Sequence, residues 1–262
     1  MAIISGYHRP ATLEAALTCL ARPATVPLGG GTKLNGTAAT GPIEVVDLQA
    51  LGLDRIDRLD GRMAVIGATV TLSQLADSPV VPHVIREAAR REQPSTLRAQ
   101  ATVGGCVASR DAESELLAAL LAHGAVVRIV APDRVSELTL QQLLGTLPPP
   151  AGGIITAVTV STAGRSSAAR TGRTRADRPI VAAVARITAD GRRCVALTGV
   201  AAAPVLIGGR DQTDTGKMDT GWMDTGGMET SRLDPPADFR GSAEYRRALA
   251  AVLTARALTA IT

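Results

Sequence analysis

The stretch VPLGGGTKLNG, residues 26–36, places three consecutive glycines between a short apolar run and the polar residues Thr32, Lys33 and Asn35. Glycine has no Cβ, so such a run lets main-chain N–H groups converge closely on an anion, of which a diphosphate is the usual kind. The alternative is a tight turn that needs positive φ angles. The stretch matches neither GxxxxGK[ST], since Lys33 follows Thr32, nor GxGxxG, which disfavours a P-loop and an ordinary Rossmann domain.

A second glycine segment, ATVGGCVASRD, occupies residues 101–111. Thr102 offers a hydroxyl, and Gly104 and Gly105 offer another stretch of bare backbone, so the two loops suit opposite ends of one extended dinucleotide. Nucleophilic catalysis by Cys106 is an alternative, but no histidine lies near it in sequence, and a small buried thiol is a commoner role for cysteine. We therefore predict a binding site without a catalytic residue.

Helical and strand patterns alternate around these two loops, which predicts an α/β context for them. Apolar residues at Leu13, Ala16, Leu17 and Leu20 form one face of a helix. Further elements predicted in this half are strands at 43–48, 63–67 and 125–130, a helical region at 72–91 with a break at Pro79 and Pro82, and a helix capped by Ser114. The prolines at 148–150 indicate a boundary between a first domain at 1–147 and a second at 151–262.

The second domain is predicted to be antiparallel. Strand patterns occupy 154–160, 180–188 and 194–200, and the step Asp190-Gly191 joins the last two as a hairpin. A Gly/Thr/Asp-rich repeat at about 211–232 reads as an insertion with little to bury, and Ser242 caps a long final helix. The repeat period does not match known calcium loops, so we expect no metal there.

Composition limits the remaining possibilities. A net charge of +4 accompanies only 2% aromatic residues and scattered arginines, so we expect no nucleic-acid partner. The three cysteines and three histidines are isolated in sequence, which disfavours a metal site and fits reduced thiols. No apolar run is long enough to cross a bilayer, and the start of the chain does not resemble a secretion signal. We therefore predict a cytoplasmic protein that does not span a membrane.

Several of these stretches together resemble one family, the FAD-binding medium subunit of molybdenum hydroxylases, as in carbon monoxide dehydrogenase, and the flavin domain of xanthine dehydrogenase. The resemblance covers nearly the whole chain, in one order. Its blocks are LGGGTKLNG (28–36), ATVGGCVASRDAESELLAALLAHGAVV (101–127), RTRADRPIVAAVARI (173–187), VALTGVAAAPV (195–205) and DFRGSAEYRRALAAVLTARAL (238–258). It implies an α+β fold: a two-part FAD-binding domain of the vanillyl-alcohol-oxidase type, followed by a smaller domain of antiparallel sheet and helices.

The resemblance also implies which residues contact FAD. Those from the two loops are Leu28, Gly29, Gly30, Gly31, Thr32, Lys33 and Leu34, and then Thr102, Val103, Gly104, Gly105 and Cys106. Glu115 stands where the family has Asp, Arg170 near a cationic position and Ile155 near an aliphatic one. For these three the alternatives are a solvated residue in a first helical turn, a solvent-facing charge and an ordinary strand residue.

By this resemblance the chain is an oxidoreductase subunit of a molybdenum hydroxylase. It would take electrons from [2Fe–2S] clusters of an iron–sulfur small subunit, fed by a molybdopterin large subunit, and pass them through FAD to an external acceptor in a hetero-oligomer. Cys106 in place of the family's Asn, Glu115, and the lack of aromatics at 165–172 motivate an alternative, a non-catalytic scaffold that has lost FAD. A stand-alone FAD oxidase or reductase is a third reading, for which we find no candidate substrate base.

Overall fold

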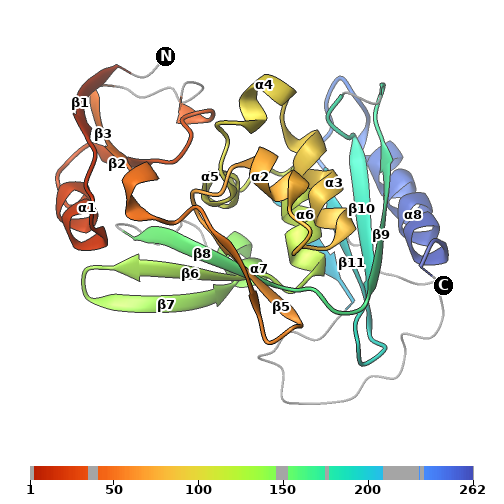
Figure 1. Cartoon of the computed structure of the whole chain (residues 1–262). Helices are drawn as coiled ribbons and strands as arrows, with labels where there is room; N and C mark the ends of the chain where they lie inside the picture. The colour runs from red at the N-terminus through yellow and green to blue at the C-terminus, as the bar shows by residue number, and fades with distance from the viewer. Residues whose placement is uncertain are drawn as a thin grey trace. The chain divides into compact units, whose positions relative to one another are not determined.

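A computed structural model describes residues 3–34, 41–145, 153–174, 177–208, 230 and 233–261 (Figure 1). The chain separates into two compact units, and each is formed by two stretches of sequence. The first unit comprises Met1–Ser109 and Gly124–Thr162, and the second comprises Arg110–His123 and Ala163–Thr262. The predicted domains, 1–147 and 151–262, divide the chain at one place only and stay a prediction. The boundary prolines at 148–150 and, apart from Thr230, the predicted insertion lie outside the described residues.

The first unit begins with a small parallel sheet, in the strand order β1-β3-β2. Its strands are β1 (Ile4–His8), β2 (Thr25–Leu28) and β3 (Ile43–Asp47), and helix α1 (Leu13–Leu20) connects β1 to β2. Ala16 and Leu17 of α1 are buried in a core that includes Val46 of β3, so the predicted helical face is confirmed. Strands β2 and β3 run parallel, and Leu28 at the end of β2 pairs with Asp47 at the end of β3. The chain therefore enters residues 29–34, the glycine loop, beside the end of β3.

A five-stranded antiparallel sheet, in the order β4-β5-β8-β6-β7, forms the rest of the first unit with its helices. Strand β8 lies in its middle and buries alternate residues, although the sequence prediction assigns 154–160 to the second domain. The predicted break at Pro79 and Pro82 is confirmed, because α2 ends at Asp77 and α3 begins at His83. The elements are β4 (Ile56–Leu59), β5 (Met63–Gly67), β6 (Val126–Ala131), β7 (Arg134–Thr139), β8 (Ile154–Ser161), η2 (Gln49–Leu51), α2 (Leu72–Asp77), α3 (His83–Glu92), α4 (Ser95–Arg98), α5 (Val103–Ser109) and α7 (Leu140–Gly145).

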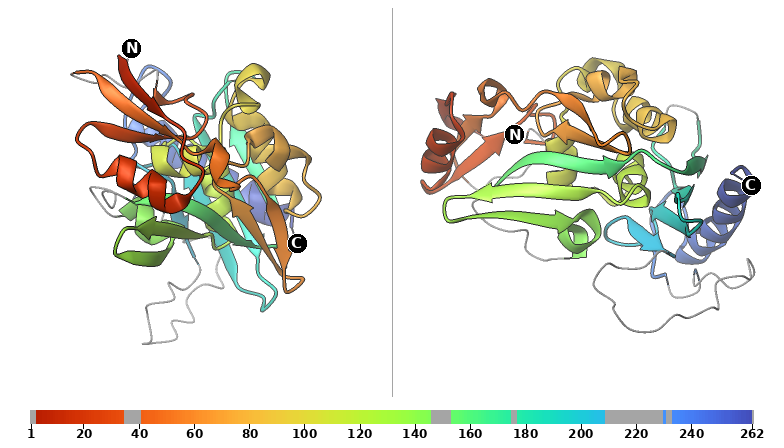
Figure 2. Two further views of the ribbon diagram at one scale, coloured as in Figure 1. Left: turned by 60° about the vertical axis from the view of Figure 1, so that its left-hand side comes forward. Right: turned by 60° about the horizontal axis from the view of Figure 1, so that its bottom comes forward.

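The second unit is a four-stranded antiparallel sheet with a helix on each face (Figures 1 and 2). Its elements are α6 (Glu115–Ala122), β9 (Arg165–Thr171), β10 (Val181–Ile187), β11 (Arg193–Thr198), β12 (Val205–Ile207) and α8 (Ala243–Thr259). Ala185 of β10 belongs to the core that includes Leu253 of α8, whereas Arg186 points to the other face and donates to the carbonyl of Ala122 in α6. The predicted antiparallel pairing is confirmed, with Gly191 at φ +83° in the β10–β11 hairpin.

Both predicted helix caps in the second unit are also confirmed. The side chain of Ser114 accepts a hydrogen bond from the N–H of Leu117 at the start of α6, and Ser242 accepts one from Tyr245 at the start of α8. Among the described residues, no helix combines the length and apolar character that crossing a membrane requires.

Candidate cofactor-binding site

A pocket of about 210 Å³ in the first unit brings the two predicted glycine segments together. This volume is below the roughly 300–1,000 Å³ of sites that enclose a whole small-molecule ligand, so the pocket suits one section of an elongated ligand. The residues that line it are Pro27, Leu28, Gly29, Gly30, Gly31, Thr32, Lys33, Leu34, Gln93, Thr102, Gly105, Cys106, Ala108 and Ser109.

The absence of side chains at Gly29 and Gly30 first allows close contact with other segments of the protein. A Cβ at Gly30 would lie 1.6 Å from the carbonyl oxygen of Gln100, and one at Gly29 would lie 2.6 Å from Oγ1 of Thr102. Gly31 has a φ of +72°, a conformation that side-chain-bearing residues rarely adopt. The sequence predicts that a ligand occupies this space. In the structure, Thr102 occupies it at Gly29 and Gln100 occupies it at Gly30.

The second glycine segment is a helix, so the prediction of a loop at 102–106 is wrong. Helix α5 starts at Val103, and Oγ1 of Thr102 accepts a hydrogen bond from the N–H of Gly105 at 3.2 Å. A Cβ at Gly104 would lie 2.8 Å from Cβ of Ala68 and 2.9 Å from its carbonyl oxygen, so this glycine permits close packing of the helix. Val103 and Gly104 are therefore buried away from the pocket, whereas Thr102, Gly105 and Cys106 line it.

Four residues line the pocket that the sequence did not predict to be part of the site, namely Pro27, Gln93, Ala108 and Ser109. Pro27 lies on β2, two residues before the first glycine of the loop. Ser109 is four residues beyond Gly105, which is the spacing of one helical face, and this signal becomes useful only once α5 is recognised as a helix. Gln93 follows the last residue of α3, and nothing in its local sequence marks it.

The polar groups of the pocket fit a phosphate-bearing ligand. Among the lining residues, Lys33 is the one with a charged side chain, and Thr32, Thr102 and Ser109 supply hydroxyl groups. The Ser109 hydroxyl also donates to the carbonyl of Cys106 at 2.8 Å. A cation, several hydroxyls and a bare glycine backbone are a donor set suited to anionic oxygens, and none of the described lining residues carries a carboxylate that would repel them.

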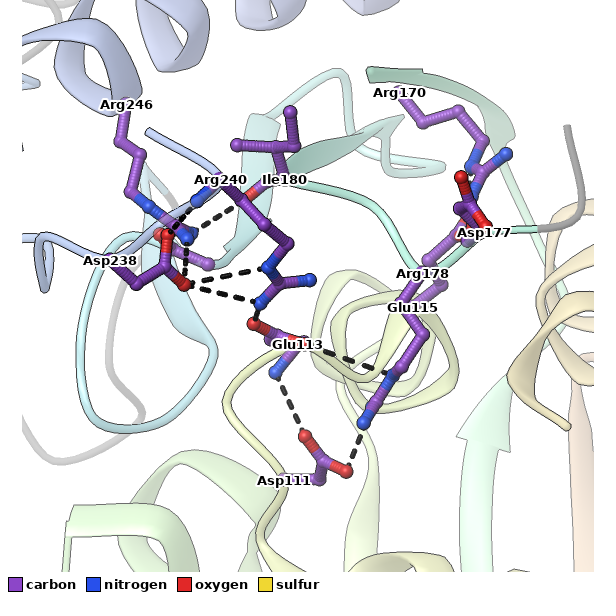
Figure 3. Close-up of polar contacts among 11 residues, drawn as sticks. Asp111, Glu113, Glu115, Arg170, Asp177, Arg178, Ile180, Asp238, Arg240 and Arg246 are labelled. Atoms are coloured by element: carbon purple, nitrogen blue, oxygen red, sulfur yellow. Dashed lines mark hydrogen bonds and ion pairs between the residues drawn. The ribbon is translucent and has the colours of Figure 1, made fainter. Parts of the chain in front are cut away.

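Glu115 and Arg170 lie in the second unit and contact each other (Figure 3). Nε of Arg170 lies 2.9 Å from Oε1 of Glu115, and their side chains are 17% and 7% exposed. Glu115 is thus a buried partner of an ion pair, and the alternative of a solvated residue is wrong. Arg170 is mostly buried, so the alternative of a solvent-facing charge is wrong as well. Ile155 is a half-buried residue of β8 that pairs with Ile129, and it does not line the pocket.

Further charges surround the start of α6 in the second unit (Figure 3). Arg178 contacts Asp111 at 2.8 Å, and Arg240 forms an ion pair with Glu113 and a weaker one with Asp238 at 3.4 Å. Asp238 in turn accepts from Arg246 at 2.7 Å. These ion pairs connect the acidic residues before α6 to the segment before α8 and to the first turns of α8.

The pairing of Asp238 predicts a dependence of stability on pH. The hydrogen bond from Arg246, assisted by the backbone N–H groups of Arg240 and Gly241, holds the pKa of Asp238 below its ordinary value of 3.8. As pH falls from about 4 through the lower folded-state pKa, the unfolded carboxyl takes up its proton first, so the free energy of unfolding decreases. The contribution of ionised Asp238 to the free energy of unfolding is fully present above the unfolded-state pKa.

We expect Asp238→Asn to reduce this loss of stability between about pH 2 and pH 5, measured by urea unfolding at each pH. Asp234→Asn is the control, because Asp234 is fully exposed and its Oδ1 atom lies 4.0 Å from Nη2 of Arg247. Equal acid sensitivity in Asp238→Asn and the unmodified protein would show that another carboxylate dominates.

Comparison with known proteins identifies the class of protein to which this fold and pocket belong. The model of a family described as the FAD binding domain in molybdopterin dehydrogenase matches residues 3–162, which include every lining residue of the pocket. The chain belongs to this family. It is therefore an FAD-binding oxidoreductase subunit of the molybdenum hydroxylase type, as its sequence predicts.

Particular relatives are similar to this chain over nearly its whole length. An uncharacterized protein of Escherichia coli (strain K12), YgfM, is 31% identical over 97% of this chain and 95% of its own length. The carbon monoxide dehydrogenase medium chain of Afipia carboxidovorans is 29% identical over 96% of this chain and 94% of its own length. A solved structure of carbon monoxide dehydrogenase from Hydrogenophaga pseudoflava matches the fold with a TM-score of 0.86, at 21% identity, covering 100% of this chain and 98% of the other. The predicted α+β fold is confirmed.

Proposed function

We propose that this chain is the electron-transfer subunit of a molybdenum hydroxylase. In this proposal it takes electrons from [2Fe–2S] clusters of a partner and passes them through FAD to an external acceptor. The observation that carries the proposal is the pocket in which the glycine loop and α5 meet, because it lies in the domain that assigns the chain to an FAD-binding family. When bound, FAD supplies the ability to accept single electrons and to deliver two.

The chain's own residues bind and orient the cofactor in this proposal. The ammonium of Lys33, the hydroxyl of Thr32 and the main-chain N–H groups of the glycine loop face the diphosphate, and Thr102 and Ser109 contact the cofactor from the side of α5. Leu28, Gly29, Gly30, Gly31, Leu34, Gly105 and Cys106 complete the contacts proposed in the pocket. Val103, Gly104, Glu115, Ile155 and Arg170 stay predicted contacts that the pocket itself does not support.

The proposed partners are an iron–sulfur small subunit and a molybdopterin large subunit, in a hetero-oligomer in the cytoplasm. Support comes from the relative named as the medium chain of carbon monoxide dehydrogenase, which this chain covers over 94% of its length. The protein's contribution to electron transfer is placement, since no general acid or base is required of it.

Two measurements on the purified full-length protein test the proposal. The first is flavin absorbance and FAD titration, in which we expect a yellow protein, or a colourless one that takes up FAD and releases it to excess ADP, which shares the diphosphate. The second is co-purification from the native host, in which we expect chains that carry molybdenum and iron. Tight FAD binding without such chains would contradict the electron-transfer role and leave a stand-alone flavoprotein.

A scaffold that has lost FAD is the second candidate function. The observation that favours it is Cys106, a lining residue of the pocket that stands where the family usually has Asn. A thiol is a weak hydrogen-bond partner, so part of the cofactor's binding energy is lost at this position. A colourless protein that no concentration of FAD reconstitutes would support this candidate over the first.

A further inference from the structure

The glycine loop is held from outside the pocket by the side chain of Gln49. Nε2 of Gln49 donates a hydrogen bond to the carbonyl oxygen of Gly29 at 3.0 Å. Gln49 is the first residue of η2, two residues after the end of β3, and it does not line the pocket. It therefore contacts the loop from outside the set of residues that line the pocket.

Holding this carbonyl fixes the orientation of the next N–H group. The peptide between Gly29 and Gly30 is planar, so the N–H of Gly30 points opposite to the Gly29 carbonyl. A glycine peptide without this restraint rotates more freely than any other, because no Cβ limits its φ and ψ angles. One hydrogen bond from Gln49 thus sets the direction of a main-chain donor within the loop.

Asp47 holds Gln49 in turn. Its Oδ1 atom accepts a hydrogen bond from the N–H of Gln49 at 2.8 Å, and its Oδ2 atom accepts one from the hydroxyl of Tyr7 on β1. Arg9 places its Nε atom 3.7 Å from the same Oδ2 atom. Asp47 is only 6% exposed, so this carboxylate is a fixed point between the sheet and η2. The hydrogen bond to Asp47 raises the pKa of Tyr7 above its ordinary value of 10.0, in keeping with a phenol that donates to a carboxylate.

We propose that Gln49, oriented by Asp47, is a positioning residue that fixes the glycine loop in its cofactor-binding conformation. The role rests on the proposed binding of FAD in this pocket. Tyr7, Asp47 and Gln49 are linked by hydrogen bonds and come from β1, β3 and η2. They therefore act on the loop from the side of the small parallel sheet. Restricting the loop before binding removes part of the conformational entropy that binding would otherwise cost.

The test replaces Gln49 in the full-length protein and measures three quantities. They are the dissociation constant for FAD, amide hydrogen exchange of the segment at 26–34 without ligand, and the thermal unfolding midpoint. For Gln49→Ala and Gln49→Glu, which both lose the donor, we expect about three- to tenfold weaker binding of FAD, the loss of one ordinary hydrogen bond. We also expect faster exchange in the loop. The unfolding midpoint should stay unchanged, because Gln49 is exposed.

Gln141→Glu is the matched control, since Gln141 is an exposed residue of α7 in the same unit and its substitution makes the same change in charge. Unchanged FAD binding and loop exchange in Gln49→Ala would overturn the positioning role. Weaker binding accompanied by a lower unfolding midpoint would also overturn it, in favour of a general loss of stability. If the unmodified protein binds no FAD, the proposed function fails, and hydrogen exchange still decides whether Gln49 orders the loop.

Discussion

Gly30→Ala is expected to destabilise the first unit by about 2–4 kcal/mol and to abolish binding in the pocket. The added Cβ would lie 1.6 Å from the carbonyl oxygen of Gln100, 2.4 Å from its carbonyl carbon and 3.1 Å from the nitrogen of Ala101. All three are backbone atoms, so no side-chain rotation relieves the overlap. The glycine loop and the segment before α5 must separate, and both segments contribute residues that line the pocket. Urea unfolding and FAD titration of the variant measure the two effects.

Gly145→Ala is the matched control for this substitution. A Cβ at Gly145 would meet no atom of the described residues within 4 Å, and this residue ends helix α7 in the same unit. We expect a change within about 0.5 kcal/mol and unaltered FAD binding. If Gly30→Ala proves as mild as the control, the close packing of Gly30 against Gln100 does not exist in solution.

The second large effect is expected from Arg246→Met, which should destabilise the protein by about 3–5 kcal/mol. Arg246 of α8 is 1% exposed, and its guanidinium donates to the carbonyl oxygens of Ile180 at 2.8 Å and Gly199 at 3.0 Å, and to Asp238 at 2.7 Å (Figure 3). Methionine retains much of the apolar length but leaves these acceptors without their donor. Buried acceptors that lose their partner cost more than the hydrogen bond itself contributed. Urea unfolding at neutral pH measures the loss.

Arg256→Met is the control, because Arg256 is an exposed residue in the last turn of the same helix. Its interaction with the helix dipole is worth about 0.3–1 kcal/mol. The double variant Asp238→Asn/Arg246→Met should lose less than the sum of the two single variants, because each single change already breaks the shared ion pair. A loss in Arg246→Met no larger than in Arg256→Met would contradict the buried role.

Local patterns in the sequence predicted many of the helices and about half of the strands that the structure describes, because the signals of these elements are contained in short windows. The cap at Ser114, the break at Pro79 and Pro82, and the hairpin at Asp190-Gly191 each depend on neighbouring residues only. The sequence did not predict that α5 is a helix, because paired glycines at Gly104 and Gly105 are poor helix formers. Gly104 is tolerated there because α5 packs closely on Ala68, a residue far from it in the sequence.

The difference between local signals and contacts of distant residues also applies to the candidate site. The glycine run at 29–31 predicted positions where side chains are excluded, but it did not predict that Gln100 and Thr102 occupy part of the space. Likewise, family resemblance assigned Glu115 and Arg170 separately to the cofactor, and only the folded second unit pairs them at 2.9 Å. Contacts between distant segments decide both cases, and no single stretch of sequence contains them.

The short piece Arg110–His123 belongs to the second unit although both of its flanks belong to the first. Its Asp111 and Glu113 are anchored there by arginines that come much later in the chain. Any chimera between this protein and a relative must therefore exchange residues 110–123 together with those from 163 onward. A hybrid joined once, in the proline stretch, would separate Asp111 and Glu113 from the arginines of this chain that pair with them.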